Sequence, residues 1–406
     1  MSALRLFQGF GIELEYMIVD AQSLAARPIA DQLLAEVAGG PASDYSQGDT
    51  AWSNELVLHV IELKTDGPAP SLSGLAGLFQ RDLTRINQIL SQQGAVILPT
   101  AMHPWFDPRT ETRIWPHEYT EVYRTFDRIF DCRGHGWSNL QSMHINLPFG
   151  DAEEFGKLHA AIRLVLPILP ALAASSPIVE GRITGLLDNR LSYYRMNSRR
   201  IPSATGKVIP EQVFTPDDYQ QRILERIYAD TAPLDPEGVL AHEFANARGA
   251  IARFDRGAIE IRVIDVQECP AADLAIAELV VAVVRALVEE KLSPAAVQRA
   301  FEVAPLHTHF ISTMVEGESA IIADREYLAA LGLPRSTHAI RAQELWQHLA
   351  EVTACPRSPA LELILSQGSL SSRILRAVGG EASRGAQEEV YRALIRAAAT
   401  GEPLRA

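Results

Sequence analysis

The sequence predicts an α+β protein built on a mostly antiparallel sheet. Four short segments alternate polar and apolar residues, which is typical of strands with two different faces. Longer segments between them carry apolar residues at helical spacing, and strands and helices do not alternate regularly. This order favours a single sheet with helices packed behind it over a parallel βαβ fold.

The four alternating segments are Gly11–Val19, Leu56–Thr65, Ser142–Leu147 and Ala258–Val266. A fifth segment, Ala95–Leu98, is apolar throughout and indicates a buried strand. Side chains two residues apart on a strand point to the same face. Each alternating segment therefore presents polar groups to one side and apolar groups to the other.

Helical patterns fill the intervals between these strands. We expect Ser71 to cap a helix that Gly94 ends. Asp151 opens a capping-box pattern at the start of the next long helix. Another helix is expected to start near Asp273, and residues 339–400 are expected to be mainly helical.

The segment Arg199–Glu211 differs from its neighbours because it has little apolar periodicity and contains two prolines and a glycine. We expect a loop there, covering the functional site. No repeat or low-complexity linker interrupts the chain, so we expect one domain over residues 1–406. It divides into a core, 1–277, and a mainly helical part, 278–406.

Composition excludes some classes of function. The chain has 406 residues, of which 47% are apolar and 21% charged, as in an ordinary globular protein. Lys and Arg total 37 against 50 Asp and Glu, a net charge of −13 that opposes nucleic-acid binding. It does not oppose nucleotide binding, because Mg²⁺ can offset both carboxylates and phosphates.

Localisation is expected to be cytoplasmic. The three cysteines, Cys132, Cys269 and Cys355, are too scattered for a disulfide framework and are expected to be reduced. No signal peptide is apparent. The longest apolar stretch, Leu274–Val288, contains two charged residues and is too short to span a membrane, so it predicts a core helix.

The polar faces of the four strands carry an unusual set of residues. They combine carboxylates with an imidazole, an amide and an arginine: Glu13 and Glu15, Glu62 and Lys64, His144 and Asn146, and Glu260 and Arg262. For any one strand, a solvated face is the simpler interpretation. Carboxylates two residues apart repel each other unless a cation lies between them, and carboxylates with one imidazole suit Mg²⁺ or Mn²⁺. Together the strands predict a divalent metal site in a cleft.

Arginine is abundant near these strands and suits the neutralisation of phosphate. Two segments supply it: Arg190, Arg195, Arg199 and Arg200, then Arg253, Arg256 and Arg262. Metal-holding carboxylates beside arginines favour phosphoryl transfer. Lys207, in the expected loop, is a further candidate for a phosphate contact. The sequence contains no P-loop and no GxGxxG motif, so a nucleotide would bind in another way.

These segments together resemble a known family. The segments GIELEY, ELVLHVIELKT, YR (Tyr123–Arg124) followed by SMHINL, YYRMN and AIEIRVIDVQECP are similar to the glutamate–cysteine ligase superfamily, especially its bacterial carboxylate–amine ligase branch. That branch carries a similar MHPW segment, here Met102–Trp105. The resemblance covers Phe10–Ala277 and depends on the ordered set ExE, ExxxxxxE, HxN and ExR.

The resemblance implies a fold and a reaction. The fold would be a glutamine-synthetase-like curved antiparallel sheet whose concave face holds ATP, Mg²⁺ and an amino acid. ATP would phosphorylate a carboxylate, usually the γ-carboxylate of glutamate, and an amine, usually that of cysteine, would displace phosphate. Such an activity would serve glutathione biosynthesis. No protein nucleophile is needed, and the base that deprotonates the amine is not assigned.

The resemblance also implies roles for individual residues. The implied metal ligands are Glu13, Glu15, Glu55, Glu62, His144 and Glu260. Arg262 would contact the transferred phosphate, and together with Glu260 and Arg195 it forms the expected catalytic group. Substrate or ATP would be held by Arg124, Asn146, Arg190, Arg195, Arg256 and Lys207. Glu55 has the opposite strand parity to Glu62, which weakens its assignment.

Two other functions compete with the ligase. A metal-dependent kinase or hydrolase acting on a small carboxylate or amide could use the same carboxylates. A non-catalytic nucleotide-binding member would be expected to have lost ligand positions, and none is lost. The expected partners are ATP, glutamate and cysteine or another amine, with no nucleic acid and no membrane. A homodimer is the default expectation for an enzyme of this size.

Overall fold

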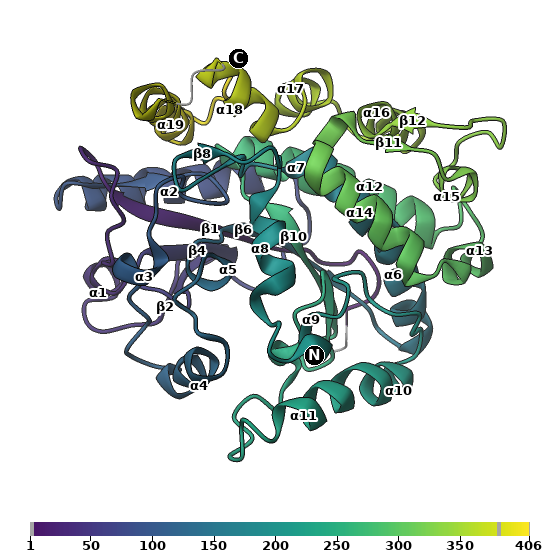
Figure 1. Cartoon of the computed structure of the whole chain (residues 1–406), viewed down its shortest axis with the longest axis horizontal. Helices are drawn as coiled ribbons and strands as arrows, with labels where there is room; N and C mark the ends of the chain where they lie inside the picture. Colours follow the sequence, from purple (N-terminus) through teal and green to yellow (C-terminus); the bar gives the residue numbers. More distant parts are fainter. Residues whose placement is uncertain (1–3, 380–382, 406) are drawn as a thin grey trace.

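The computed structural model describes residues 4–379 and 383–405. Its centre is an eight-stranded sheet in which the pairings are antiparallel, as predicted (Figure 1). The order is β2–β3–β4–β1–β6–β10–β9, and β5 pairs with β1 beyond the end of β6. The bounds are β1 (Gly11–Asp20), β2 (Asp44–Ser46), β3 (Thr50–Asn54), β4 (Val60–Thr65), β5 (Ala95–Leu98), β6 (Ser142–Pro148), β9 (Ala250–Arg253) and β10 (Ala258–Asp265).

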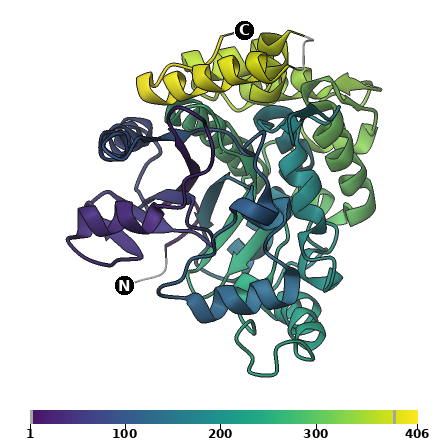
Figure 2. The ribbon, with the colours of Figure 1, turned by 60° about the vertical axis from the view of Figure 1, so that its left-hand side comes forward.

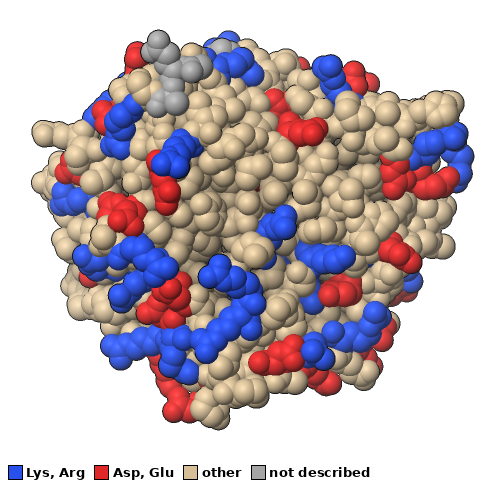
Figure 3. All heavy atoms as spheres, in the orientation of Figure 1, with Lys and Arg blue, Asp and Glu red and all other residues tan. Residues whose placement is uncertain are grey.

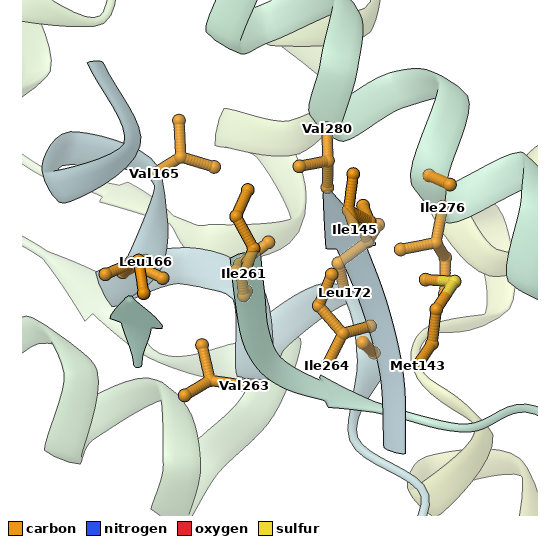
Figure 4. Packing of buried hydrophobic residues seen from close by; sticks show 14 of the residues in the cluster. Met143, Ile145, Val165, Leu166, Leu172, Ile261, Val263, Ile264, Ile276 and Val280 are labelled. Atoms are coloured by element: carbon orange, nitrogen blue, oxygen red, sulfur yellow. The ribbon is translucent and has the colours of Figure 1, made fainter. Parts of the chain in front are cut away.

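Three long helices cover the outer face of this sheet: α2 (Leu75–Ser91), α6 (Ala152–Val165) and α12 (Pro270–Val288). The apolar alternates of β1, such as Ile12, Leu14 and Tyr16, are fully buried in this layer. Figure 4 shows the same layer behind β6 and β10, where strand and helix side chains meet: Met143, Ile145, Ile261, Ile264, Val165, Leu166, Leu172, Ile276 and Val280. Burying each large apolar side chain contributes on the order of 1.5–3 kcal/mol.

The remaining elements surround this core. The other helices are α1 (Ala30–Ala38), α3 (Pro108–Glu111), α4 (Thr120–Phe130), α5 (His135–Ser138), α7 (Leu169–Ala173), α8 (Asn189–Asn197), α9 (Pro202–Thr205), α10 (Pro216–Tyr219), α11 (Glu225–Thr231), α13 (Ala295–Ala300), α14 (Val303–Glu316), α15 (Arg325–Ala330), α16 (Ala342–Val352), α17 (Pro359–Gln367), α18 (Leu370–Val378) and α19 (Arg384–Thr400). Short 3₁₀ helices are η1 (Leu166–Ile168), η3 (Glu243–Ala245) and η4 (Gly317–Ser319), and η2 (Gln220–Leu224) is a short π-helix. Two small ribbons pair β7 (Ile178–Val179) with β8 (Arg182–Ile183), and β11 (Ile321–Ile322) with β12 (Ile340–Arg341).

The C-terminal helices close one end of the inner face of the sheet. Met17 and Val19 share strand parity with Glu15, yet both are buried in an apolar cluster with Ile374 of α18 and Tyr391 of α19. Figure 2 shows these helices, in yellow, lying across one end of the molecule. The inner face of β1 is therefore apolar at its C-terminal half and acidic at its N-terminal half.

The predicted start of the helix after Ser71 was wrong by three residues. Gly74, in the left-handed region at φ 87°, is the N-cap, and Leu75 is the first helical residue. The Ser71 hydroxyl instead accepts a hydrogen bond from the Ser73 amide within the preceding turn. Gly94, at φ 66°, does follow the end of the helix as predicted.

The start of α6 at Asp151 is confirmed, because its carboxylate accepts a hydrogen bond from the Glu154 amide at 3.0 Å. In the described part of the chain, the helical stretch 152–173 is the one long and apolar enough by composition to cross a membrane. Its most apolar part is 94% buried inside the molecule, as in the core helix of a globular protein.

The segment Arg199–Glu211 is more ordered than the expected loop. It contains the short helix α9, and Ile201 and Val208 are buried. The Arg248 guanidinium holds it in place by bonding the Glu211 carboxylate and the carbonyl of Ser203. The segment therefore forms part of the packed structure.

Candidate active site

The strand register brings the predicted polar residues together on the inner face. Glu13 on β1 lies opposite His144 on β6, and Glu15 lies opposite Glu62 on β4. Glu260 on β10 lies next to the same group, one strand beyond His144. Directly opposed residues in an antiparallel sheet share a face, so strand pairing alone builds the acidic surface.

The acidic residues form two clusters. The first cluster consists of Glu13, His144 and Glu260, and the second of Glu15, Glu55 and Glu62. Within each cluster, one potential ligand atom of each residue lies within 4.8 Å of those of the other two residues. His144 connects the two clusters. Its Nδ1 lies 2.8 Å from Glu13 Oε2, and its Nε2 lies 3.8 Å from Glu15 Oε1.

Glu55 joins the second cluster, and the parity argument against it was wrong. That argument placed Glu55 next to a strand starting at Leu56, whereas β4 starts only at Val60. Glu55 directly follows β3, and a turn separates it from β4. Alternation along a single strand therefore does not decide whether Glu55 and Glu62 face the same side. The sequence contains no alternation strong enough to separate β3 from β4.

Electrostatics indicate that the second cluster needs a compensating cation. Burial, together with the charge of Glu13, raises the pKa of Glu62 to about 7. Burial and the charges of Glu15 and Glu62 raise the pKa of Glu55 well above its ordinary value. Carboxylates this close cannot all be ionised at neutral pH unless a cation shares them.

The donor set fits a hard divalent cation. Five carboxylates and one imidazole make up the two clusters, which is the chemistry preferred by Mg²⁺ and Mn²⁺. For His144, burial lowers the pKa but is outweighed by the hydrogen bond to Glu13 and by the charges of Glu15 and Glu260, so that the pKa rises to about 9. The same negative field that holds a proton there would hold a metal ion.

Arginines border the first cluster on the β10 side. Arg262 Nε donates to Glu260 Oε1 at 3.0 Å, and Arg253 Nη1 lies 3.6 Å from Glu260 Oε2. Burial alone would raise the pKa of the Glu260 carboxyl, but the charges of Arg262 and His144 outweigh it and lower the pKa. Glu260 is therefore ionised, and it can pair with the arginines and also bind a cation.

A β-bulge adds a residue that the sequence did not indicate. Ile261 pairs with Ile145 but Ile264 pairs with Met143, so β10 carries one extra residue at this point. Asp265 is thereby turned to the inner face, where it bonds Arg190 Nε at 2.5 Å and is fully buried. Strict alternation had placed Asp265 on the opposite face from Glu260.

Two serines that we did not predict support the carboxylates. The Ser142 amide and hydroxyl donate to Glu15 Oε2 at 2.7 and 2.9 Å. The Ser53 hydroxyl donates to Glu62 Oε1 at 2.7 Å and accepts a hydrogen bond from Lys64 Nζ at 2.8 Å. Ser142 could have been found, because it alternates with His144 on the same strand.

Two pockets lie on either side of these clusters. The larger, of about 540 Å³, contains polar residues at the sheet and an apolar, largely aromatic wall. Its polar lining includes Glu15, Glu55, Ser142, His144, Arg190, Arg253, Arg256 and Arg262. We call it the aromatic chamber. The smaller, of about 460 Å³, is lined by Glu13, Lys64, Asn146 and Arg256 together with several glycines, and we call it the glycine pocket.

Several predicted binding residues take different places. Asn146 lines the glycine pocket, and its Nδ2 donates to Glu13 Oε1 at 3.0 Å. Arg124, Arg195 and Lys207 line neither pocket. The Lys207 carbonyl bonds His307 Nδ1 at 2.9 Å, and Arg124 is exposed on α4. Their roles stay predictions.

The surface around the sites is basic despite the net charge of −13. Figure 3 shows Lys and Arg side chains, in blue, gathered in the middle and lower left of the face, where Figure 1 shows α8 and α4. Exposed arginines on or next to these helices include Arg124, Arg128, Arg199 and Arg200. An anionic substrate would be attracted to this face.

Comparison with known proteins identifies the family. The model of glutamate–cysteine ligase family 2 matches residues 9–393. The chain belongs to this family. The match extends well beyond Ala277, so the expectation that the resemblance ends there was wrong. Family membership places the protein among ligases of the glutamate–cysteine ligase type.

Two relatives of the chain illustrate the range of similarity. An uncharacterized protein of Archaeoglobus fulgidus is 36% identical over 69% of this chain and 75% of its own length. A Rubrobacter xylanophilus protein named "Putative glutamate--cysteine ligase 2-3" is 25% identical over 47% of this chain and 49% of its own length. The chain thus spans about half the length of the second relative.

Solved structures share the fold. Glutamate–cysteine ligase of Francisella tularensis, in complex with AMP, superposes with a TM-score of 0.61 at 14% identity, covering 97% of this chain and 89% of the other. A bifunctional glutathione synthetase of Pasteurella multocida gives 0.54 at 14% identity, covering 98% of this chain and 51% of the other. The predicted fold class is confirmed by these similarities.

Proposed function

We propose that this family member is an ATP-dependent carboxylate–amine ligase. ATP would phosphorylate the γ-carboxylate of glutamate, and an amine, cysteine or another, would attack the acyl phosphate to form a γ-glutamyl amide and release phosphate. The observation that carries the proposal is the position of the two acidic clusters between the two pockets. One pocket can hold the nucleotide and the other the molecules being joined, with the reacting groups meeting at the carboxylates.

The glycine pocket suits the nucleotide. Glycine backbones and the cations of Lys64 and Arg256, which can contact phosphate groups, line it beside the carboxylates of Glu13, Asp44 and Asp66. Gly11 is required there, because a Cβ atom would lie 2.8 Å from Asn146 Cβ. The AMP complex of the Francisella structure supports a nucleotide in this fold.

The residues of the acidic clusters would hold Mg²⁺. When bound, the metal would offset the repulsion between the attacking carboxylate and the γ-phosphate. Arg262, held by Glu260, presents its guanidinium to the aromatic chamber, where charge develops on the transferred phosphate. Arg190, held by Asp265, presents a second guanidinium to the same space and can bind a substrate carboxylate.

The test is an incubation of the protein with ATP, Mg²⁺, glutamate and a panel of amines. We expect phosphate release that requires both glutamate and an amine, with the matching γ-glutamyl amide detected by mass spectrometry. Release of phosphate from ATP without any amine, and without an amide product, would instead favour the kinase or hydrolase alternative.

A further inference from the structure

We propose that the amine accepted by this enzyme carries an aromatic or similarly large apolar ring, and that this ring binds against the wall of the aromatic chamber. The inference rests on the proposed ligase function and names the class of its acceptor. The chamber extends well beyond the acidic clusters, and its volume of about 540 Å³ lies within the usual range of small-molecule sites, about 300–1,000 Å³.

The apolar part of the lining, which we call the wall, is built from rings and aliphatic groups. It consists of Leu56, Val57, Val60, Tyr119, Val122, Tyr123, Phe126, Trp137, Leu140 and Phe244. The rings contact one another: Phe126 lies 5.3 Å from Trp137 and 6.2 Å from Phe244 between ring centroids. A side chain as small as that of cysteine would leave most of this surface uncovered.

The polar atoms on the wall are largely engaged by the protein itself. Trp137 Nε1 donates to the carbonyl of Asn197 at 3.2 Å, and the Tyr123 hydroxyl accepts a hydrogen bond from Asn54 at 3.1 Å. Ring faces and edges are therefore the main surface that the wall presents to a ligand. A hydrocarbon ring satisfies such a surface, whereas a purine base needs partners for its ring nitrogens and amino group.

Tyr119 gives the wall an exposed edge. It precedes α4 at φ 67° and is 57% exposed, although it also lines the chamber. A large aromatic side chain held at the mouth of a pocket is well placed to cover an apolar ligand. The apolar end of the acceptor would lie near Tyr119, and its amino group would point toward the acidic clusters.

Competition between amines tests this substrate class. Phenylalanine, 2-phenylethylamine, cysteine and glycine are supplied together with ATP, Mg²⁺ and glutamate, and the amide products are quantified. We expect a ring-bearing amine to exceed cysteine and glycine at least 10-fold in kcat/KM. A preference for cysteine or glycine would overturn the inference while leaving the ligase function intact.

Two variants and one control locate the ring. Val122→Trp should fill the chamber and Tyr119→Asn should remove the exposed ring, since asparagine tolerates a positive φ. Each should raise the ratio of KM for the ring-bearing amine to KM for glycine about 10-fold. The control is Tyr193→Ala, because Tyr193 is an exposed aromatic residue on α8 that does not line the chamber.

Direct binding separates this inference from the ligase function. Calorimetric titration of the protein with 2-phenylethylamine, with ethylamine as the comparison, requires no turnover. Binding of the aromatic amine that Val122→Trp abolishes would support the inference even in the absence of amide formation. Equal binding of both amines, or binding unaffected by Val122→Trp, would overturn it.

Discussion

Glu13 and Glu15 lie two residues apart on β1 but belong to different acidic clusters. Glu13 faces His144 on one neighbouring strand, and Glu15 faces Glu62 on the other. A short alternating segment thus supplies one ligand to each cluster, and His144 lies between them. Neither glutamate is therefore placed to supply the ligand atom of the other.

Glu13→Gln and Glu260→Gln should each abolish turnover while the fold survives. Both substitutions keep the shape of the side chain but remove a negative charge from the first cluster, which weakens its hold on a divalent cation. Amide formation and Mg²⁺ binding by calorimetry should both be lost, with the circular dichroism spectrum unchanged. Glu225→Gln, on the exposed surface of α11, is the matched control, and near-normal activity in either cluster variant would contradict the metal assignment.

Asp265 holds Arg190 by a buried ion pair. Substitutions at these two residues should separate the effect of the pair on stability from its effect on substrate binding. Asp265→Ala leaves the Arg190 guanidinium buried without its bonded partner, which should cost about 3–5 kcal/mol in the free energy of unfolding. The double variant Asp265→Ala, Arg190→Met should recover most of this stability, as measured by urea unfolding.

The same double variant should not recover activity, because Arg190 lines the aromatic chamber. We expect its KM for the carboxylate donor to rise at least 10-fold. Recovery of both stability and KM in the double variant would show that Arg190 has only a structural role.

At the scale of elements, α8 carries residues that line the aromatic chamber. Arg190, Tyr194 and Asn197 lie on one side of the helix, and the Asp188 carboxylate caps its first turn by accepting a hydrogen bond from the Leu191 amide at 2.8 Å. Burial and the nearby charge of Asp265 raise the pKa of Asp188 well above its ordinary value. Burial therefore favours the neutral form of this capping carboxyl group.

Asp188→Asn should be tolerated, because asparagine preserves the cap and resembles the neutral carboxyl group. Asp188→Ala removes the cap and should lower the free energy of unfolding by about 0.5–2 kcal/mol. It should also raise KM for substrate, because the start of α8 positions Arg190. Urea unfolding and steady-state kinetics of the two variants side by side provide the measurement, and equal effects of both substitutions would contradict this account.

At the scale of the whole molecule, two buried histidines connect the inner face to the surrounding layers. His59 Nε2 lies 2.7 Å from the carbonyl of Ser138. His103 Nε2 lies 2.6 Å from the carbonyl of Leu24, and its Nδ1 accepts a hydrogen bond from the Trp105 amide at 3.1 Å. These contacts give both histidines structural roles and leave no room for a second ring proton on His103.

Burial lowers the pKa of His59 and of His103 from 6.5 to about 4. The unfolded chain therefore binds more protons than the folded protein between these pH values, and the free energy of unfolding should fall as pH decreases from about 6.5 to about 4. Each histidine should contribute up to about 3 kcal/mol to this loss.

Urea unfolding at a series of pH values measures this dependence. The glutamine of His59→Gln can still bond the Ser138 carbonyl but does not titrate. The variant should therefore lack the contribution of His59 to the pH dependence of the free energy of unfolding. An unchanged slope in this variant would show that His59 does not contribute.

The sequence by itself determined the strand faces and most of the acidic residues. Alternation over β1, β4, β6 and β10 predicted which side chains share a face, because side-chain direction on a strand follows from local geometry. Only the tertiary structure decided what local geometry cannot encode. The turn after β3 brings Glu55 to Glu62, and a single extra residue in β10 turns Asp265 inward. The aromatic wall also depends on long-range contacts, since its rings come from segments as distant as α4 and Phe244. Pairing and packing between remote segments, which leave no periodic signal in the chain, set these features.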